Sequence, residues 1–154
     1  MDVWLLVILC LSLIWLAVQD FRSRMFYWIL LPTIFISAFA RGVLAISPKF
    51  WLSITLINGL LALVIVGTLV AYLHFMKRES NLLTSFGLGD ILLLGAITPL
   101  LLPIQFLLTV LLSSVLGLLG YLFLRHRGQL NRIPFAGWIG LVSVCFLIVD
   151  RFLL

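Results

Sequence analysis

The chain has 154 residues, of which 64% are hydrophobic and only 10% are charged. Its mean hydropathy is +1.32. A water-soluble domain of this size cannot bury so much apolar surface, so the composition excludes a soluble enzyme or binding module. The net charge of +5 is expected to face anionic lipid headgroups, and the sequence has no basic, aromatic-rich patch that would indicate nucleic acid as a partner.

Six apolar segments follow one another along the chain. A membrane span needs about 20 apolar residues, and a lone span satisfies its own backbone hydrogen bonds only as a helix. The sequence therefore predicts an all-α polytopic membrane protein with six transmembrane helices in a single domain, residues 1–154. The first segment is interpreted as an uncleaved span, because its basic residues follow it. The expected segments are 3–19, 26–46, 50–74, 91–103, 104–124 and 134–153.

The fourth segment is short and has Pro99 and Pro103 near its end. Residues 91–124 would form a helix of about 51 Å at 1.5 Å per residue, which is too long for one span and short for two. Pro103 favours a sharp turn. We therefore expect a short fourth helix, a tight turn and then a full fifth helix.

Basic residues are unevenly divided between the two sides of a six-span chain. The loops after the first, third and fifth segments hold Arg22, Arg24, Lys77, Arg78, Arg125, Arg127 and Arg132. The other side holds Arg41, Lys49 and Arg151. Cytoplasmic loops carry the excess of Lys and Arg, so this pattern predicts that both termini are extracytoplasmic.

Two of the acidic residues stand at the predicted cytoplasmic edge of the membrane. Asp20 ends the first segment and Asp90 begins the fourth. Either one alone is equally explained as an interfacial charge at a helix end. Together, two neighbouring carboxylates can share a proton. One then accepts a proton from water while the other donates to a peptide carbonyl, which is the chemistry of aspartic proteases.

Gly87 and Gly89 precede Asp90 in the sequence GLGD. Glycine adopts positive φ at no cost and lets another backbone approach closely. A helix cap would need only the aspartate. The two glycines therefore predict an extended or irregular segment against which a peptide could lie.

Three motifs occur in order: DFRSR beginning at Asp20, GLGD at 87–90, and IPF at 133–135. Together they resemble the type IV prepilin peptidase family of GxGD membrane aspartic proteases, in its short form without the methyltransferase insert. The resemblance implies that Asp20 and Asp90 are the catalytic pair. It also implies that the site is shaped by Gly87, Gly89, Ile133, Pro134 and Phe135.

The same resemblance implies a substrate and a location. The substrate is a prepilin or pseudopilin, with a basic leader in the cytoplasm and a hydrophobic N-terminal helix in the lipid bilayer. The enzyme is expected in the bacterial or archaeal cytoplasmic (inner) membrane, with no metal or other cofactor. The family usually has lysine where this chain has Leu92, and an Ile-Pro-Asn-like segment where it reads MFYWILLP. N-methyltransferase activity is not expected.

Three alternatives stay open at this point. A presenilin-like intramembrane aspartic protease also uses GxGD, although Gln19 stands where that class has tyrosine. A catalytically inactive family member could act as an assembly subunit. A proton-coupled carrier would need an acid at mid-membrane, and the polar residues within the spans, Asn58 and Gln105, are expected to form hydrogen bonds between helices.

Overall fold

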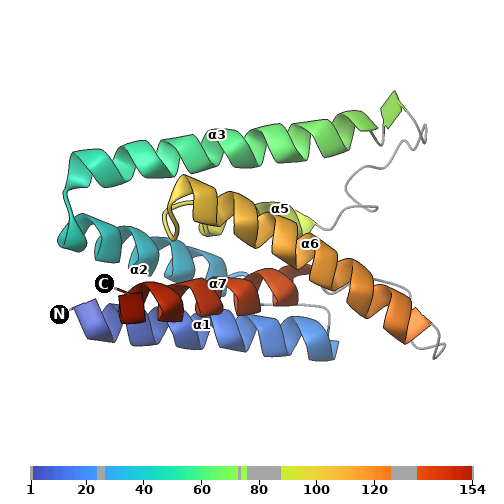
Figure 1. Cartoon of the computed structure of the whole chain (residues 1–154), viewed down its shortest axis with the longest axis horizontal. Helices are drawn as coiled ribbons and strands as arrows, with labels where there is room; N and C mark the ends of the chain where they lie inside the picture. The colour runs from blue at the N-terminus through green and yellow to red at the C-terminus, as the bar shows by residue number, and fades with distance from the viewer. Residues whose placement is uncertain (1, 24–26, 73, 76–87, 126–134, 154) are drawn as a thin grey trace.

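The computed structural model describes residues 2–23, 27–72, 74–75, 88–125 and 135–153. In these ranges the chain is all-α (Figure 1). Its helices are α1 (Asp2–Ser23), α2 (Leu30–Ala45), α3 (Pro48–Tyr72), α5 (Leu88–Ala96), α6 (Pro103–Arg125) and α7 (Phe135–Leu153).

Three helices, α1, α3 and α6, are long and apolar enough to cross a membrane. Two shorter apolar helices, α2 and α7, accompany them. The chain thus has the helices of a multi-pass membrane protein. The nine-residue helix α5 rises only about 13.5 Å at 1.5 Å per residue, less than half of a hydrocarbon core of about 30 Å. It cannot cross by itself.

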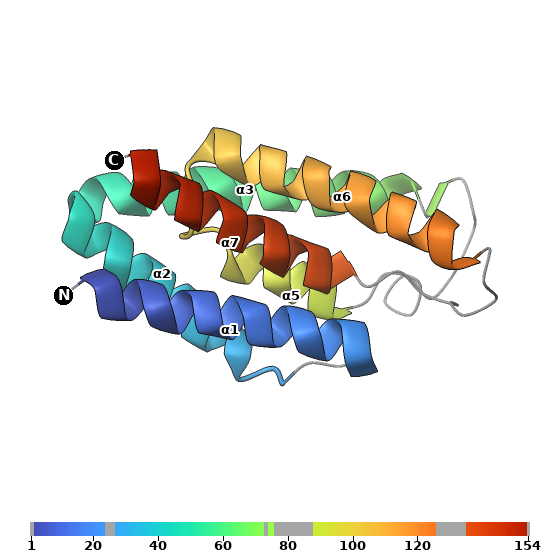
Figure 2. The same ribbon diagram turned by 60° about the horizontal axis from the view of Figure 1, so that its bottom comes forward.

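The helices run up and down in one bundle, and both termini lie at the same end (Figure 1). At the opposite end α1, α3 and α6 finish, and α5 and α7 begin. Helix α1 packs against α2 and α7, α6 packs against α7, and α5 contacts α2, α3 and α7 (Figure 2). Large apolar side chains such as Trp4, Leu11 and Trp15 cover the outside, as expected where the solvent is lipid.

Helices α1 and α7 cross closely because α7 has glycines at the contact. A Cβ atom on Gly140 would lie 2.9 Å from the carbonyl oxygen of Leu13, and one on Gly137 would lie 2.9 Å from Cε2 of Phe21. Small residues let helix backbones approach in membranes, where lipid removes most of the hydrophobic drive for association. The close crossing brings the C-terminal turn of α1 onto the first turn of α7.

The predicted short helix and tight turn in the fourth segment are present, but the helix boundary differs from the expected one. Helix α5 ends at Ala96 and residues 97–100 form turns. Pro103 is the first residue of α6, a position at which its missing N–H leaves no bond unmade. The expectation that the fourth helix reaches residue 103 is therefore wrong.

Side chains from α3 supply donors to the carbonyl groups of this turn. Trp51 Nε1 donates to the Pro99 carbonyl at 2.9 Å, and Asn58 Nδ2 donates to the carbonyls of Thr98 and Leu101 at 2.8 and 2.7 Å. Backbone that is not helical is tolerated at membrane depth only when protein covers it and satisfies its polar groups. Asn58 therefore bonds to another segment of the bundle, as expected, but its acceptors lie in the connection between α5 and α6 and not in a helix.

Gln105 has the second interhelical bond expected from the sequence. Its Nε2 donates to Asp150 Oδ1 on α7 at 2.8 Å, and its Oε1 accepts the backbone N–H of Leu102 at 3.1 Å. Gln105 therefore ties the start of α6 to the end of α7, at the end of the bundle that holds the termini.

Candidate active site

Asp20 lies in the last turn of α1 and is only 7% exposed. Its Oδ2 atom accepts a 2.7 Å hydrogen bond from the backbone N–H of Gly137, the third residue of α7. The α1–α7 crossing makes this bond possible, because Gly137 has no side chain to hold Phe21 and the neighbouring Asp20 away. A buried carboxylate is thus paired with a backbone donor from a segment 117 residues away.

Asp90 is the third residue of α5 and is half-buried. Its carboxyl group interacts with the backbone N–H of Ala136, and it lies within the electrostatic reach of Asp20. The structure therefore brings together the two acids that the sequence singled out. They come from α1 and α5 and meet at the start of α7.

The N-terminus of α7 explains why the two acids gather there. The first N–H groups of a helix have no partner within the helix, and the helix dipole places partial positive charge at that end. Helix N-termini accordingly attract anions. Ala136 provides the N–H group facing Asp90, and Gly137 provides the one bonded to Asp20. One helix end thus serves both carboxyl groups.

The electrostatics of the pair favour a shared proton. Burial, and to a smaller extent the charge of Asp20, raise the pKa of Asp90 to about 6, although the Ala136 N–H acts in the opposite direction. Asp90 lies in the first turn of α5, outside the helices that are long enough to span the membrane. Carboxyl groups whose charges interact in this way titrate as a coupled pair.

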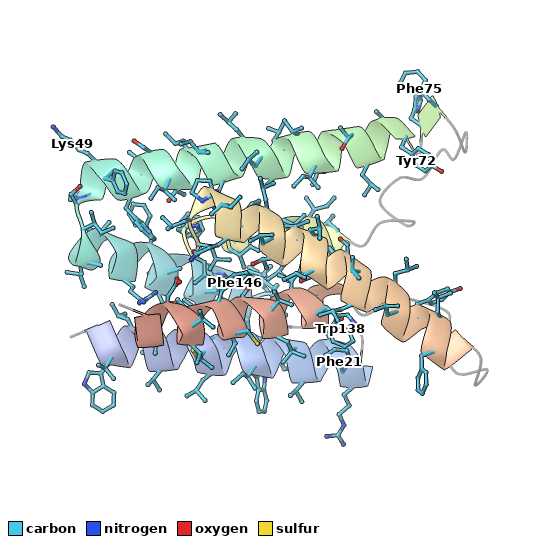
Figure 3. All side chains as sticks on the ribbon, viewed as in Figure 1. Phe21, Lys49, Tyr72, Phe75, Trp138 and Phe146 are labelled. Atoms are coloured by element: carbon cyan, nitrogen blue, oxygen red, sulfur yellow. The ribbon has the colours of Figure 1, made fainter. Side chains whose placement is uncertain are left out.

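An aromatic contact fixes the end of α1 beside the carboxyl pair. The rings of Phe21 and Trp138 meet edge to face with centroids 5.3 Å apart (Figure 3). Trp138 also borders Gly120 of α6, where a Cβ would lie 3.4 Å from its ring. On the other side, Gln19 Oε1 accepts the N–H of Tyr27 at 3.2 Å. These contacts tie the helix that carries Asp20 to α6, α7 and the chain leading into α2.

The site-shaping residues expected from the resemblance are only partly described. Gly89 is half-buried and helical, in the first turn of α5, and Leu88 is helical too. The extended segment expected before Asp90 is therefore not found at these two residues. Phe135 is the first residue of α7 and packs against the core. Gly87, Ile133 and Pro134 lie outside the described residues.

Ala136 and Gly137 are functional candidates that sequence reasoning missed. The motif IPF was interpreted as packing near the site, whereas the next two residues direct backbone N–H groups at the acids. The available signal was a proline shortly before an apolar segment, which is typical of the first turn of a helix. That signal predicts where a helix starts, but does not show what its N-terminus faces.

The arrangement can perform acid–base chemistry at one point. A carboxyl pair holding one proton provides an ionised acceptor and a protonated donor within the same site. Among the described residues, no group of three or more His, Cys, Asp or Glu side chains could hold a metal ion. No protein-family profile, curated protein or solved structure significantly matches the chain.

Proposed function

We propose that this chain is a membrane aspartic endopeptidase that removes the leader peptide from prepilins or pseudopilins. The observation that carries the proposal is the meeting of Asp20 and Asp90 at the N-terminus of α7. Burying two acids side by side is costly unless they share a proton or have donors. Both acids here face backbone donors and the pKa of Asp90 is raised, which supports a pair used for chemistry over two independent interfacial charges.

In the proposed reaction the pair carries one proton. The ionised carboxylate removes a proton from a water molecule, whose oxygen attacks the carbonyl carbon of the scissile peptide bond. The protonated carboxyl group donates its proton to the carbonyl oxygen. The resulting tetrahedral intermediate collapses and the carbon–nitrogen bond breaks. The proton taken from water is delivered to the leaving amine, and one hydroxyl proton of the intermediate returns to the carboxylate that donated, so that the pair again carries one proton. The Ala136 and Gly137 N–H groups stabilise the negative charge of the pair.

The charge pattern supports a cytoplasmic position for this site. Arg22 is exposed at the end of α1 beside Asp20, and the loops at this end of the bundle hold most of the basic residues. Both termini lie at the other end of the bundle, so the positive-inside rule makes them extracytoplasmic. A prepilin leader lies in the cytoplasm and its apolar helix in the bilayer.

Leader cleavage in membranes tests the proposal. The chain is co-expressed with each candidate prepilin, and the mobility shift is followed for wild type, Asp20→Asn and Asp90→Asn. Asp150→Asn is the matched control, because Asp150 is an acid at the opposite end of the bundle, bonded to Gln105. We expect cleavage in wild type and the control, and its loss in both site variants at equal expression.

Other outcomes separate the alternatives. Cleavage that persists in Asp20→Asn and Asp90→Asn removes the pair from the chemistry. A cut inside the apolar helix of the substrate, instead of at the leader boundary, indicates a presenilin-like protease. Absence of cleavage, together with a pilus or secretion defect that the two asparagine variants rescue, indicates an assembly subunit.

A further inference from the structure

Helix α5 carries Asp90 at one end and the turn 97–100 at the other. The helix is short and buries few apolar side chains: only Leu93, Leu94 and Ala96 of its residues are buried. Sliding a helix by one residue moves every side chain 1.5 Å along the axis and about 100° around it. Something besides apolar packing must fix the position of Asp90 relative to Asp20.

The turn supplies that fixed point through α3. Two of its carbonyl groups and that of the next residue accept side-chain donors from α3: Pro99 from Trp51, and Thr98 and Leu101 from Asn58. Asn58 is fully buried, and Trp51 is only 8% exposed. Both donors of this anchoring set are therefore shielded from competing partners in solvent.

Trp51 is itself held in place by α2. Its indole ring covers Gly42, where an added Cβ would overlap the ring. The ring therefore sits between a glycine of α2 and the backbone of the turn, with its N–H directed at the Pro99 carbonyl. The turn is fixed against two helices, α2 and α3, neither of which carries an acid of the candidate site.

We infer that Asn58 and Trp51 are positioning residues for the candidate active site, because they hold the α5–α6 turn and thereby set the depth and rotation at which Asp90 faces Asp20. The hydrogen bonds that these side chains donate go to the carbonyl groups of residues 98, 99 and 101, at the end of α5 away from Asp90. They act through α5: fixing the turn at the C-terminal end of this short helix also fixes the position of Asp90 at its N-terminal end. The inference deepens the proposed function and rests on it for its effect on cleavage, but not for its effect on geometry.

Two variants remove the donors one at a time. Asn58→Leu removes both amide bonds with little change of volume, and Trp51→Phe removes the indole N–H while leaving a ring over Gly42. Thr55→Val is the matched control, because Thr55 lies on the same helix and its hydroxyl donates within that helix, to the Trp51 carbonyl. The control loses a hydrogen bond in α3 without touching the turn.

The geometric readout is the distance between two spin labels. The native thiols, Cys10 and Cys145, are first replaced by serine, and labels are placed at Arg22 on α1 and Leu92 on α5, both of which are exposed. We expect a narrow distance distribution in the parent and in Thr55→Val, and a broadened or shifted one in Asn58→Leu and Trp51→Phe. Unchanged distributions in both variants would overturn the inference.

The second readout is leader cleavage by the same proteins without labels. A displaced catalytic group lowers kcat on the order of ten- to a hundred-fold, so we expect that loss in Asn58→Leu with KM unchanged. If wild type cleaves nothing, the proposed function fails, and the label distances still decide the positioning role. If Asn58→Leu shifts the distances but keeps full kcat, α3 does not position the catalytic pair.

Discussion

The carbonyl oxygen of Leu13 on α1 lies 2.9 Å from the point that a Cβ atom on Gly140 of α7 would occupy. This oxygen belongs to the backbone, so it cannot move away by a change of rotamer as a side-chain atom can. Gly140→Ala should therefore push α1 and α7 apart and lengthen the bond between Asp20 and Gly137. We expect a loss of about 1–3 kcal/mol in the free energy of unfolding, as for other overpacked contacts, measured by thermal unfolding in detergent.

Gly67→Ala is the control for Gly140→Ala. Gly67 is exposed on α3 and a Cβ there would meet nothing within 4 Å. An alanine at such a helical position is favoured by roughly 0.5–1 kcal/mol over glycine. The two substitutions are chemically identical and should shift the melting temperature in opposite directions. A melting temperature that is unchanged or raised in Gly140→Ala would contradict the close crossing.

Gly137→Ala tests the contact between α7 and Phe21. The added methyl group would approach Cε2 of Phe21 at 2.9 Å, and the ring is held against Trp138. We expect destabilisation of about 1 kcal/mol or more, with Phe21→Leu in the same chain recovering most of it. Contacting residues show such non-additive energies in double-mutant cycles, and additive effects of the two changes would show that the ring does not limit the approach.

The pKa of Asp90 predicts a pH dependence of stability. Its value of about 6 lies above the ordinary value of 3.8, so the folded chain binds this proton more tightly than the unfolded chain. The contribution of Asp90 to the free energy of unfolding is fully present below about pH 4 and is lost as the pH rises through 6. At 1.36 kcal/mol per pKa unit the loss is at most about 3 kcal/mol.

Asp90→Asn removes that dependence. The free energy of unfolding of this variant is therefore compared with that of wild type at each pH. The carboxyl groups other than Asp20 titrate alike in both proteins, so the difference between their unfolding free energies isolates the titration of Asp90 together with its effect on Asp20. We expect the asparagine variant to gain stability relative to wild type between pH 4 and 7. A difference that stays constant over this range would contradict a raised pKa.

Gln105→Leu tests the bond between α6 and α7 at the other end of the bundle. The change leaves the carboxylate of Asp150 without the 2.8 Å donor from Gln105. Hydrogen bonds between membrane helices average about 0.6 kcal/mol and reach about 1.7, and we expect a loss in this range by thermal unfolding. Ser114→Ala, which removes an exposed hydroxyl bonded within α6, should have no effect beyond about 0.5 kcal/mol.

The sequence predicted much of this architecture because its signals are local. Apolar runs of span length predict helices, and the positions of Asp20 and Asp90 at two run ends predicted that they would share one end of the bundle. What it could not predict depends on partners distant in the chain. Pro99 favours the end of α5 at Ala96, but the carbonyl groups that follow are satisfied by Trp51 and Asn58, and no residue near Ala96 encodes those donors.

The hydrogen-bond donors that face the two acids could not be predicted from the sequence, for a different reason. Ala136 and Gly137 act through backbone N–H groups, which every residue except proline has, so no side-chain type marks them. Only the fold shows that the first turn of α7 faces the end of α1. In the same way, the two glycines before Asp90 suggested irregular backbone, but at Gly89 the helix has already begun.

The order of the three segments along the chain has a consequence for biosynthesis. Asp20 emerges from the ribosome first, Asp90 follows, and the backbone donors for both come from α7, the last helix to be made. A nascent chain that stops before residue 135 has both acids but neither N–H donor. The two acids can therefore reach their final arrangement only after the last helix has been inserted.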